Sequence, residues 1–93
     1  MNTRHFVMYV LCDQTETRFG FTVSRKIGKA VVRNRVRRRL AEVVYRNLDR
    51  FPEGRWWVFN TKRASAQATY QMLEADLVAA VNRYVETCGS FPD

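Results

Sequence analysis

One segment, residues 25–39, limits more than any other what this chain can fold into. It carries eight positive charges and no acid, and apolar residues recur through it and beyond at intervals of three and four. Those apolar residues are Val32, Val36, Leu40, Val43 and Val44. The spacing is that of one buried face of a helix. We therefore predict a helix from about Ala30 to Leu48 that lies on the surface of a core, with most of its cations turned outward.

The outward side of this helix follows from helical geometry. At about 100° per residue, four polar residues fall opposite the apolar stripe, and two arginines flank it. Asn34, Arg35, Arg37 and Arg38 lie opposite, and Arg33 and Arg39 flank the stripe. Like charges at this density repel one another and lower helix stability. Local stability therefore does not explain them.

The same segment accounts for the whole charge excess of the chain. With 16 Lys and Arg against 9 Asp and Glu the formal net charge is +7, and the eight cations of residues 25–39 leave eight against nine elsewhere. A helix that is merely solvated usually alternates acids with bases. A confined basic face is instead typical of a polyanion-binding surface. Thirteen of the sixteen cations are Arg, whose planar guanidinium suits phosphates and bases.

Two segments before the basic helix alternate as strands do. They run from His5 to Asp13 and from Arg18 to Ser24. If they pair as a hairpin, their aromatic and apolar sets share one core face. That core face is Phe6, Met8 and Val10 with Phe19, Phe21 and Val23, and the opposite face is Val7, Tyr9 and Leu11 with Thr22 and Ser24. The second face, half apolar and half hydroxyl-bearing, would suit unpaired bases.

A third strand follows the turn signal Phe51-Pro52-Glu53-Gly54. It is predicted from Arg55 to Lys62, with Trp56 and Trp57 on opposite faces. One Trp belongs in the core. The other is expected at an edge or against a helix, with stacking on RNA as the alternative.

A second helix is predicted from about Thr69 to Thr87, with Thr69 as its N-cap. Its buried stripe is Tyr70, Leu73, Leu77, Ala80, Val81 and Tyr84. We expect the tail from Gly89 to Asp93 to be frayed.

The sequence offers little for catalysis. His5 is the only histidine, and Cys12 and Cys88 have neither the spacing of a metal site nor the number for a disulfide scaffold. The common phosphate-loop, dinucleotide, serine-hydrolase and zinc-protease motifs do not occur, and the acids form no cluster suited to a two-metal nuclease. There is no apolar run of about 20 residues and no signal peptide. We predict one cytoplasmic domain, residues 1–93, that binds rather than catalyses and holds no cofactor itself.

The run from Phe21 to Arg38, FTVSRKIGKAVVRNRVRR, closely resembles the signature of the protein subunit of bacterial ribonuclease P. That family has a strand ending in Ser-Lys-Lys, then a hydrophobic-Gly-x-Ala-Val step, then an Arg-Asn-Arg motif that opens a basic helix. The resemblance extends through the first strand from Arg4 to Leu11 and through the third strand into Thr69-Tyr70. It covers nearly the whole chain.

The resemblance implies a compact single-domain α+β fold, shared with a ribosomal protein domain, in which two main helices pack a mixed sheet. The basic helix would lie in a left-handed β-α-β crossover. About 98% of such crossovers are right-handed, so the left hand is implied by the family alone. The function implied is that of an RNA-binding subunit. It assists the catalytic RNA in removing the 5′ leader of precursor tRNA, by binding the RNA subunit and the leader and by strengthening substrate and magnesium binding. Hydrolysis is carried by the RNA, with magnesium required by the RNA-containing holoenzyme.

Carried over by position, two sets of residues receive roles. The expected RNA-subunit contacts are Lys26, Lys29, Arg33, Asn34, Arg35, Arg37 and Arg38, and the expected leader contacts are Val7, Tyr9, Leu11, Thr22 and Ser24. Asn34 is informative, because a patch that needs only charge has no use for an amide, whereas an amide can cap, orient a guanidinium or bond a base edge.

Two departures from the family pattern bear on these expectations. Ala41 precedes Glu42 where the family usually has Arg, so one RNA contact is expected to be missing. The family also begins with a basic helix that forms one wall of the leader cleft, whereas here the first strand follows Met1 almost at once. We therefore expect the face of Val7, Tyr9 and Leu11 to be uncovered and prone to self-association.

Three rival interpretations share some of these features. A general structured-RNA-binding or ribosomal protein would have the same charge pattern. A DNA-binding domain would place the basic helix in a major groove and would be expected to dimerise over two half-sites. A protein-only nuclease would need the carboxylate cluster that the sequence does not offer.

Overall fold

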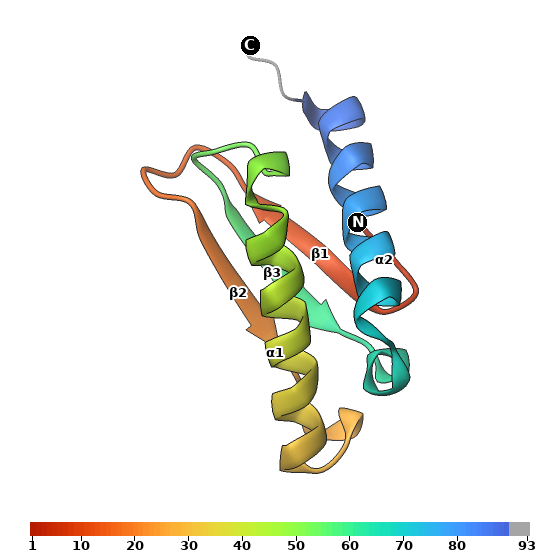
Figure 1. Cartoon of the computed structure of the whole chain (residues 1–93). Helices are drawn as coiled ribbons and strands as arrows, with labels where there is room; N and C mark the ends of the chain where they lie inside the picture. Colours follow the sequence, from red (N-terminus) through yellow and green to blue (C-terminus); the bar gives the residue numbers. More distant parts are fainter. Residues whose placement is uncertain (90–93) are drawn as a thin grey trace.

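Three strands and two main helices make up the computed structural model, which describes residues 1–89 (Figure 1). In chain order they are β1 (Phe6–Leu11), β2 (Arg18–Thr22), α1 (Ala30–Arg46), β3 (Trp56–Thr61) and α2 (Tyr70–Tyr84). Short 3₁₀ turns join them: η1 (Arg25–Ile27) before α1, η2 (Leu48–Arg50) after it, and η3 (Arg63–Gln67) before α2. The π-helical turn η4 (Val85–Gly89) follows α2. All five predicted elements are confirmed, with ends that differ by at most three residues, and most of the predicted frayed tail lies outside the described residues.

The strand order is β1-β3-β2, with β1 antiparallel and β2 parallel to β3. The hairpin that was considered for the first two strands therefore does not form. The parallel pairing of β2 with β3 needs a long crossover, which α1 provides, and this places β3 between the two strands that the sequence paired. Their aromatic sets still share the core face, because Met8 and Phe21 both lie opposite Phe59 in the register.

The crossover from β2 through α1 to β3 is left-handed. Figure 1 shows α1 in front of the sheet, with β2 and β3 both running downward and β3 to the right of β2. A chain that descends on the left, returns through a helix in front and descends on the right turns with the left hand. Crossovers of this kind are nearly always right-handed. The left-handed crossover that the family resemblance implied is therefore confirmed.

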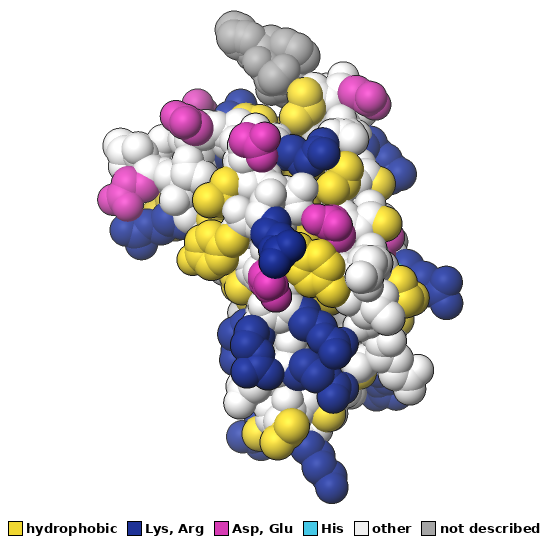
Figure 2. Space-filling view, in the orientation of Figure 1, with side chains coloured by type: hydrophobic (Ala, Val, Ile, Leu, Met, Phe, Trp, Pro, Cys, Tyr) yellow, Lys and Arg dark blue, Asp and Glu magenta, His cyan; other side chains and the backbone are white. Residues whose placement is uncertain are grey.

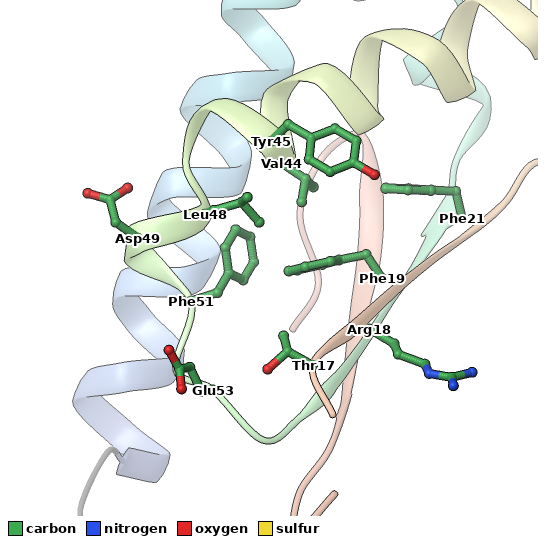
Figure 3. A pocket seen from close by; sticks show the side chains of 10 residues that line it. All are labelled: Thr17, Arg18, Phe19, Phe21, Val44, Tyr45, Leu48, Asp49, Phe51 and Glu53. Atoms are coloured by element: carbon green, nitrogen blue, oxygen red, sulfur yellow. The ribbon is translucent and has the colours of Figure 1, made fainter. Parts of the chain in front are cut away.

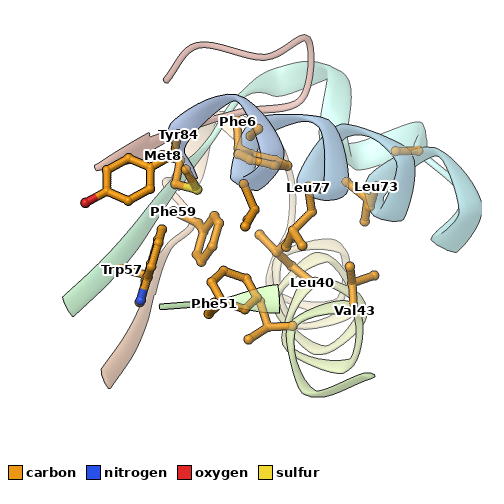
Figure 4. Packing of buried hydrophobic residues seen from close by; sticks show 14 residues of the cluster. Phe6, Met8, Leu40, Val43, Phe51, Trp57, Phe59, Leu73, Leu77 and Tyr84 are labelled. Carbon is orange, nitrogen blue, oxygen red and sulfur yellow. The ribbon is translucent and has the colours of Figure 1, made fainter. Parts of the chain in front are cut away.

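The core lies between the sheet and the two helices, which cover the same face (Figures 1 and 4). Trp57 and Phe59 of the central strand are fully buried, and Phe51 packs edge-on against Trp57 with ring centroids 4.9 Å apart. The helices contribute residues of the predicted stripes, although Val32 and Tyr70 are only half-buried. The buried helical residues are Val36, Leu40, Val43 and Val44 from α1 and Leu73, Leu77, Ala80, Val81 and Tyr84 from α2.

One polar contact caps α2, and another joins it to the start of β1. The hydroxyl of Thr69 accepts a hydrogen bond from the backbone N–H of Met72 at 3.2 Å, which confirms Thr69 as the N-cap. His5, which is 4% exposed, lies just before β1, and its Nδ1 is 2.5 Å from Oδ2 of Asp76 on α2. The only histidine of the chain thus holds β1 against α2.

Candidate nucleic-acid interface

The basic residues of η1 and the first half of α1 form one continuous surface. In Figure 2 the lower part of the molecule shows Lys and Arg without Asp or Glu, whereas the acids lie in the upper part. We call this area the basic surface. We define it by the residues that the sequence assigned to RNA-subunit binding, which lie on η1, at the N-cap of α1 and in the first half of α1: Lys26, Lys29, Arg33, Asn34, Arg35, Arg37 and Arg38.

The members of the basic surface differ in exposure. Lys26, Lys29, Asn34, Arg37 and Arg38 are exposed, and the first two arginines of the motif are half-buried. Exposed cations are free to follow a phosphate backbone. The half-buried Arg33 and Arg35 are held in place by hydrogen bonds to backbone carbonyl oxygens.

Arg35 was predicted to face outward, and that prediction is wrong in part. It donates from Nη2 to the carbonyl oxygen of Ala66 in η3 at 3.3 Å, and its Nε is buried without a partner in the described residues. Arg39 donates in the same way to the carbonyl of Ala68 at 2.9 Å. The periodicity of α1 alone could not reveal this, because η3 and the start of α2 pack against the flank of α1, not against its apolar stripe.

Arg33 stabilises the turn that leads into α1. It donates from Nη1 to the carbonyl oxygen of Gly28 at 3.0 Å. Gly28 has φ of 153°, and a Cβ there would lie 3.2 Å from Val32. Glycine is needed at this position both for its backbone conformation and for the close approach of Val32. The orientation of η1, and of Lys26 within it, depends on this turn.

The electrostatics of α1 favour an anion at its N-terminal end. Lys29 is the N-cap, and neither a side-chain cap within residues 1–89 nor an acid in the first turn offsets the positive end of the helix dipole. Cations here are unfavourable for the isolated helix but favourable for a bound phosphate. Asn34 accepts from Nη1 of Arg37 at 3.4 Å, so its oxygen helps to orient a guanidinium while its amino group remains available for an acceptor.

The second surface is the side of the sheet opposite the helices, which no element of residues 1–89 covers. We call it the open face. β1 contributes Val7, Tyr9 and Leu11, β3 contributes Trp56, Val58 and Asn60, and β2 contributes Arg18, Gly20 and Thr22. Tyr9 is 52% exposed and Leu11 is 50% exposed. Four of the five predicted leader residues lie on this face.

The fifth, Ser24, lies beyond the end of β2 and is exposed at the start of η1. It therefore sits between the open face and the basic surface and connects the two. The contribution of β3 was not predicted from the sequence, because a hairpin leaves no room for a strand between β1 and β2. The alternation of the third strand, with two adjacent tryptophans on opposite faces, was the signal that could have revealed it.

A hollow of about 660 Å³ lies on the other side of the sheet, between β2 and the C-terminal end of α1. Figure 3 shows Phe19, Phe21 and Tyr45 turned toward it, whereas the side chain of Arg18 points away. Its rim carries the acids Asp49 and Glu53. The hollow shares no residue with the basic surface.

The described residues hold little that could perform acid–base or metal chemistry. Among residues 1–89 no three His, Cys, Asp or Glu gather as ligands for a metal ion, and none of the helices is long and apolar enough to cross a membrane. Burial raises the pKa of the Tyr84 hydroxyl above its ordinary 10.0, and Tyr84 lies in the core and not on either candidate surface.

Comparison with known proteins agrees with this arrangement. The sequence model of the family Ribonuclease P matches residues 1–85. The ribonuclease P protein component of Pelotomaculum thermopropionicum is 42% identical over 81 residues, which are 86% of this chain and 72% of that protein. The corresponding protein of Finegoldia magna is 39% identical over 75 residues, 81% of this chain and 66% of that protein.

Solved structures show the same fold. The RNase P protein from Thermotoga maritima superposes with a TM-score of 0.80 at 24% identity, over 89% of this chain and 80% of that one. The Staphylococcus aureus RNase P protein gives a TM-score of 0.76 at 22% identity, over 96% and 82%.

Proposed function

The chain belongs to the ribonuclease P protein component family, and we propose that its basic surface binds the RNA subunit while its open face binds the 5′ leader of precursor tRNA. As a member of this family it is a partner of the ribonuclease P RNA in bacterial tRNA processing. The main observation behind this assignment is that the two surfaces are separate and differ in chemistry. The basic surface is cationic and lies on η1 and α1, whereas the open face is largely apolar and lies on the sheet.

The proposal for the basic surface rests on three hydrogen bonds. Arg33 and Arg35 donate to backbone carbonyl oxygens, which fixes their positions. Arg37 donates to the side-chain oxygen of Asn34, and both Arg37 and Arg38 are exposed to solvent. A folded RNA presents closely spaced phosphates, and each cation that neutralises one releases counterions and strengthens binding. Asn34 adds an amide that can bond a base edge. These features support a structured RNA as the ligand.

The proposal for the open face rests on its chemistry and its position. Unpaired bases stack on aromatic side chains and bond to hydroxyls and amides, and this face offers Tyr9, Thr22 and Asn60. The parallel strands β2 and β3 both end toward the basic side, at Thr22 and Thr61, and Ser24 and Lys62 follow these ends. A single strand leaving an RNA held on the basic surface can therefore continue onto the open face.

Catalysis is assigned to the RNA subunit. The side chains of residues 1–89 form no group of three or more His, Cys, Asp or Glu that could hold a metal ion, which supports placing the magnesium required by the holoenzyme on the RNA. The protein's part is to hold the RNA subunit and the leader, which favours substrate binding. The proposed site of action is the cytoplasm, where bacterial precursor tRNA is processed.

Capture of RNA from a bacterial extract tests this function against the rival of a general RNA-binding or ribosomal protein. The full chain is immobilised, and the bound RNA is sequenced, with the double variant Arg37→Ala/Arg38→Ala as the control. We expect the ribonuclease P RNA and leader-bearing precursor tRNAs to be enriched by the native chain and reduced with the variant. Enrichment of ribosomal RNA in their place would contradict the proposal.

A further inference from the structure

We propose that Trp56 is a base-stacking position of the open face and that it contacts the part of the leader furthest from the basic surface. This inference rests on the proposed binding of the leader. It adds a residue of the central strand to the predicted set, and it assigns that residue to one end of the bound leader.

The two adjacent tryptophans show why Trp56 is unusual. Trp57 is fully buried and packs edge-on against Phe51 and Tyr84. Trp56 is 38% exposed, although it belongs to the central strand, where edge effects cannot account for an uncovered aromatic ring. The second Trp was expected at an edge or against a helix, with stacking on RNA as the alternative, and it lies at neither an edge nor a helix.

The neighbours of Trp56 form a row across the sheet. In the register it lies between Leu11 of β1 and Arg18 of β2. The guanidinium carbon of Arg18 is 5.6 Å from the centroid of the indole, within the range of a cation–π contact. Arg18 also lies 3.4 Å from a carboxylate oxygen of Glu16, with both side chains well exposed, so this ion pair holds Arg18 only weakly. Together an indole, a guanidinium plane and a half-exposed Leu make a platform for a planar base.

The position of the row determines which part of the leader it meets. Trp56 and Asn60 lie on the same face of β3, four residues apart, which is about 13 Å along a strand. About four stacked nucleotides span that length at ~3.4 Å each. Asn60 is at the end toward the basic surface, and Trp56 is at the far end. A leader that enters from the basic surface therefore reaches Trp56 last.

The charge at the far end favours stacking over phosphate contact. Asp13, Glu16 and Glu53 lie in the turns and loops that border the Trp56 row, and they oppose the approach of phosphates. Stacking on an aromatic ring needs no charge and tolerates any base. A base is thus the part of the leader that this end of the face can hold.

The test uses the holoenzyme, reconstituted from the full chain and the ribonuclease P RNA, with precursor tRNAs whose leaders differ in length. The affinity for each precursor is divided by the affinity for mature tRNA. Trp56→Leu removes the aromatic plane but stays apolar, and Trp56→Phe is the matched control that keeps a plane. We expect Trp56→Leu to lower the ratio by about tenfold for long leaders and to leave it unchanged for leaders of one or two nucleotides. Trp56→Phe should retain most of the ratio.

Three results would overturn the inference: a ratio with Trp56→Leu equal to that of the native chain, an equal loss in both variants, or a loss that is as large for the shortest leaders. A Val7→Ser/Tyr9→Ser variant distinguishes an error in the role of Trp56 from an error in the proposed binding of the leader to the open face. If that variant abolishes leader preference while Trp56→Leu does not, only the role of Trp56 is wrong. If neither affects it, the leader does not bind the open face at all.

Discussion

Arg35 donates a hydrogen bond to the carbonyl oxygen of Ala66 at 3.3 Å, so the second arginine of the basic motif is attached to the turn that precedes α2. The same side chain belongs to the surface that we assign to the RNA subunit. RNA binding and the contact with η3 therefore both involve Arg35. The two roles can be separated by comparing Arg35 with the exposed Arg37 and Arg38, two and three residues further along α1.

The first prediction makes that comparison. Arg37→Ala/Arg38→Ala should weaken RNA-subunit binding by about tenfold at low salt and flatten the log–log salt slope by roughly 1.4–1.8, because each phosphate contact contributes about 0.7–0.9. Its free energy of unfolding should not fall, since both residues are exposed and the removal of two like charges relieves repulsion within α1. Arg35→Ala should weaken binding and also cost about 1 kcal/mol of stability. Salt titrations and urea unfolding measure the two effects, and an unchanged slope in the double variant would mean that these cations are only solvated.

The second prediction concerns the turn before α1. Gly28→Ala should lower the free energy of unfolding by about 1–3 kcal/mol and weaken RNA-subunit binding, because a Cβ there lies 3.2 Å from Val32 and the backbone conformation favours glycine. Gly20→Ala is the matched control, since the nearest atom to its Cβ would be 4.0 Å away. Equal stability of the two variants in urea unfolding would show that this turn is not constrained.

The third prediction is self-association through the open face. Tyr9, Leu11 and Trp56 are large apolar side chains that remain exposed there, and such patches tend to bind partners. Sedimentation at increasing protein concentration should therefore show a rising average mass, which the variant Tyr9→Ser/Leu11→Gln reduces. A constant monomer mass up to the highest concentration would contradict this expectation.

The fourth prediction is a loss of stability at high pH. Burial raises the pKa of Tyr84 above 10.0, so the folded chain keeps this proton at pH values where the unfolded chain has lost it. Stability should then fall as the pH rises from about 10. Tyr84→Phe should flatten that fall, although it also removes the hydrogen bond from Arg55 at 3.0 Å and lowers the starting stability. Unfolding free energies measured at several pH values give the pH dependence of stability for the native chain and for Tyr84→Phe. Identical pH dependence in the two would show that Tyr84 is not the group responsible.

The sequence predicted local structure well because local structure depends on nearby residues. The helical spacing of Leu40 and Val43 and the cap at Thr69 needed no knowledge of the rest of the chain. The pairing of the strands could not be predicted from nearby residues. Whether β1 pairs with β2 or with β3 depends on where α1 returns the chain, and the left hand of that crossover came only from the family resemblance.

The same distinction between local and long-range structure applies to the candidate site. The residues of the basic surface could be placed on one turn and one helix because they lie close together in sequence, although the predicted outward position of Arg35 is wrong in part. The bond from Arg35 to Ala66 and the place of Trp56 on the open face depend on segments about 30 and 40 residues away, and the spacing of neither residue reveals those segments.

Cleavage of precursor tRNA at a magnesium concentration too low for the RNA subunit alone tests the central claim most directly. Three reactions are compared: the RNA subunit alone, this chain alone, and the two together. We predict site-specific removal of the 5′ leader only in the combined reaction, with more protein needed when the chain carries Arg37→Ala/Arg38→Ala. Cleavage by the chain without RNA, or no gain when it is added to the RNA subunit, would contradict the account.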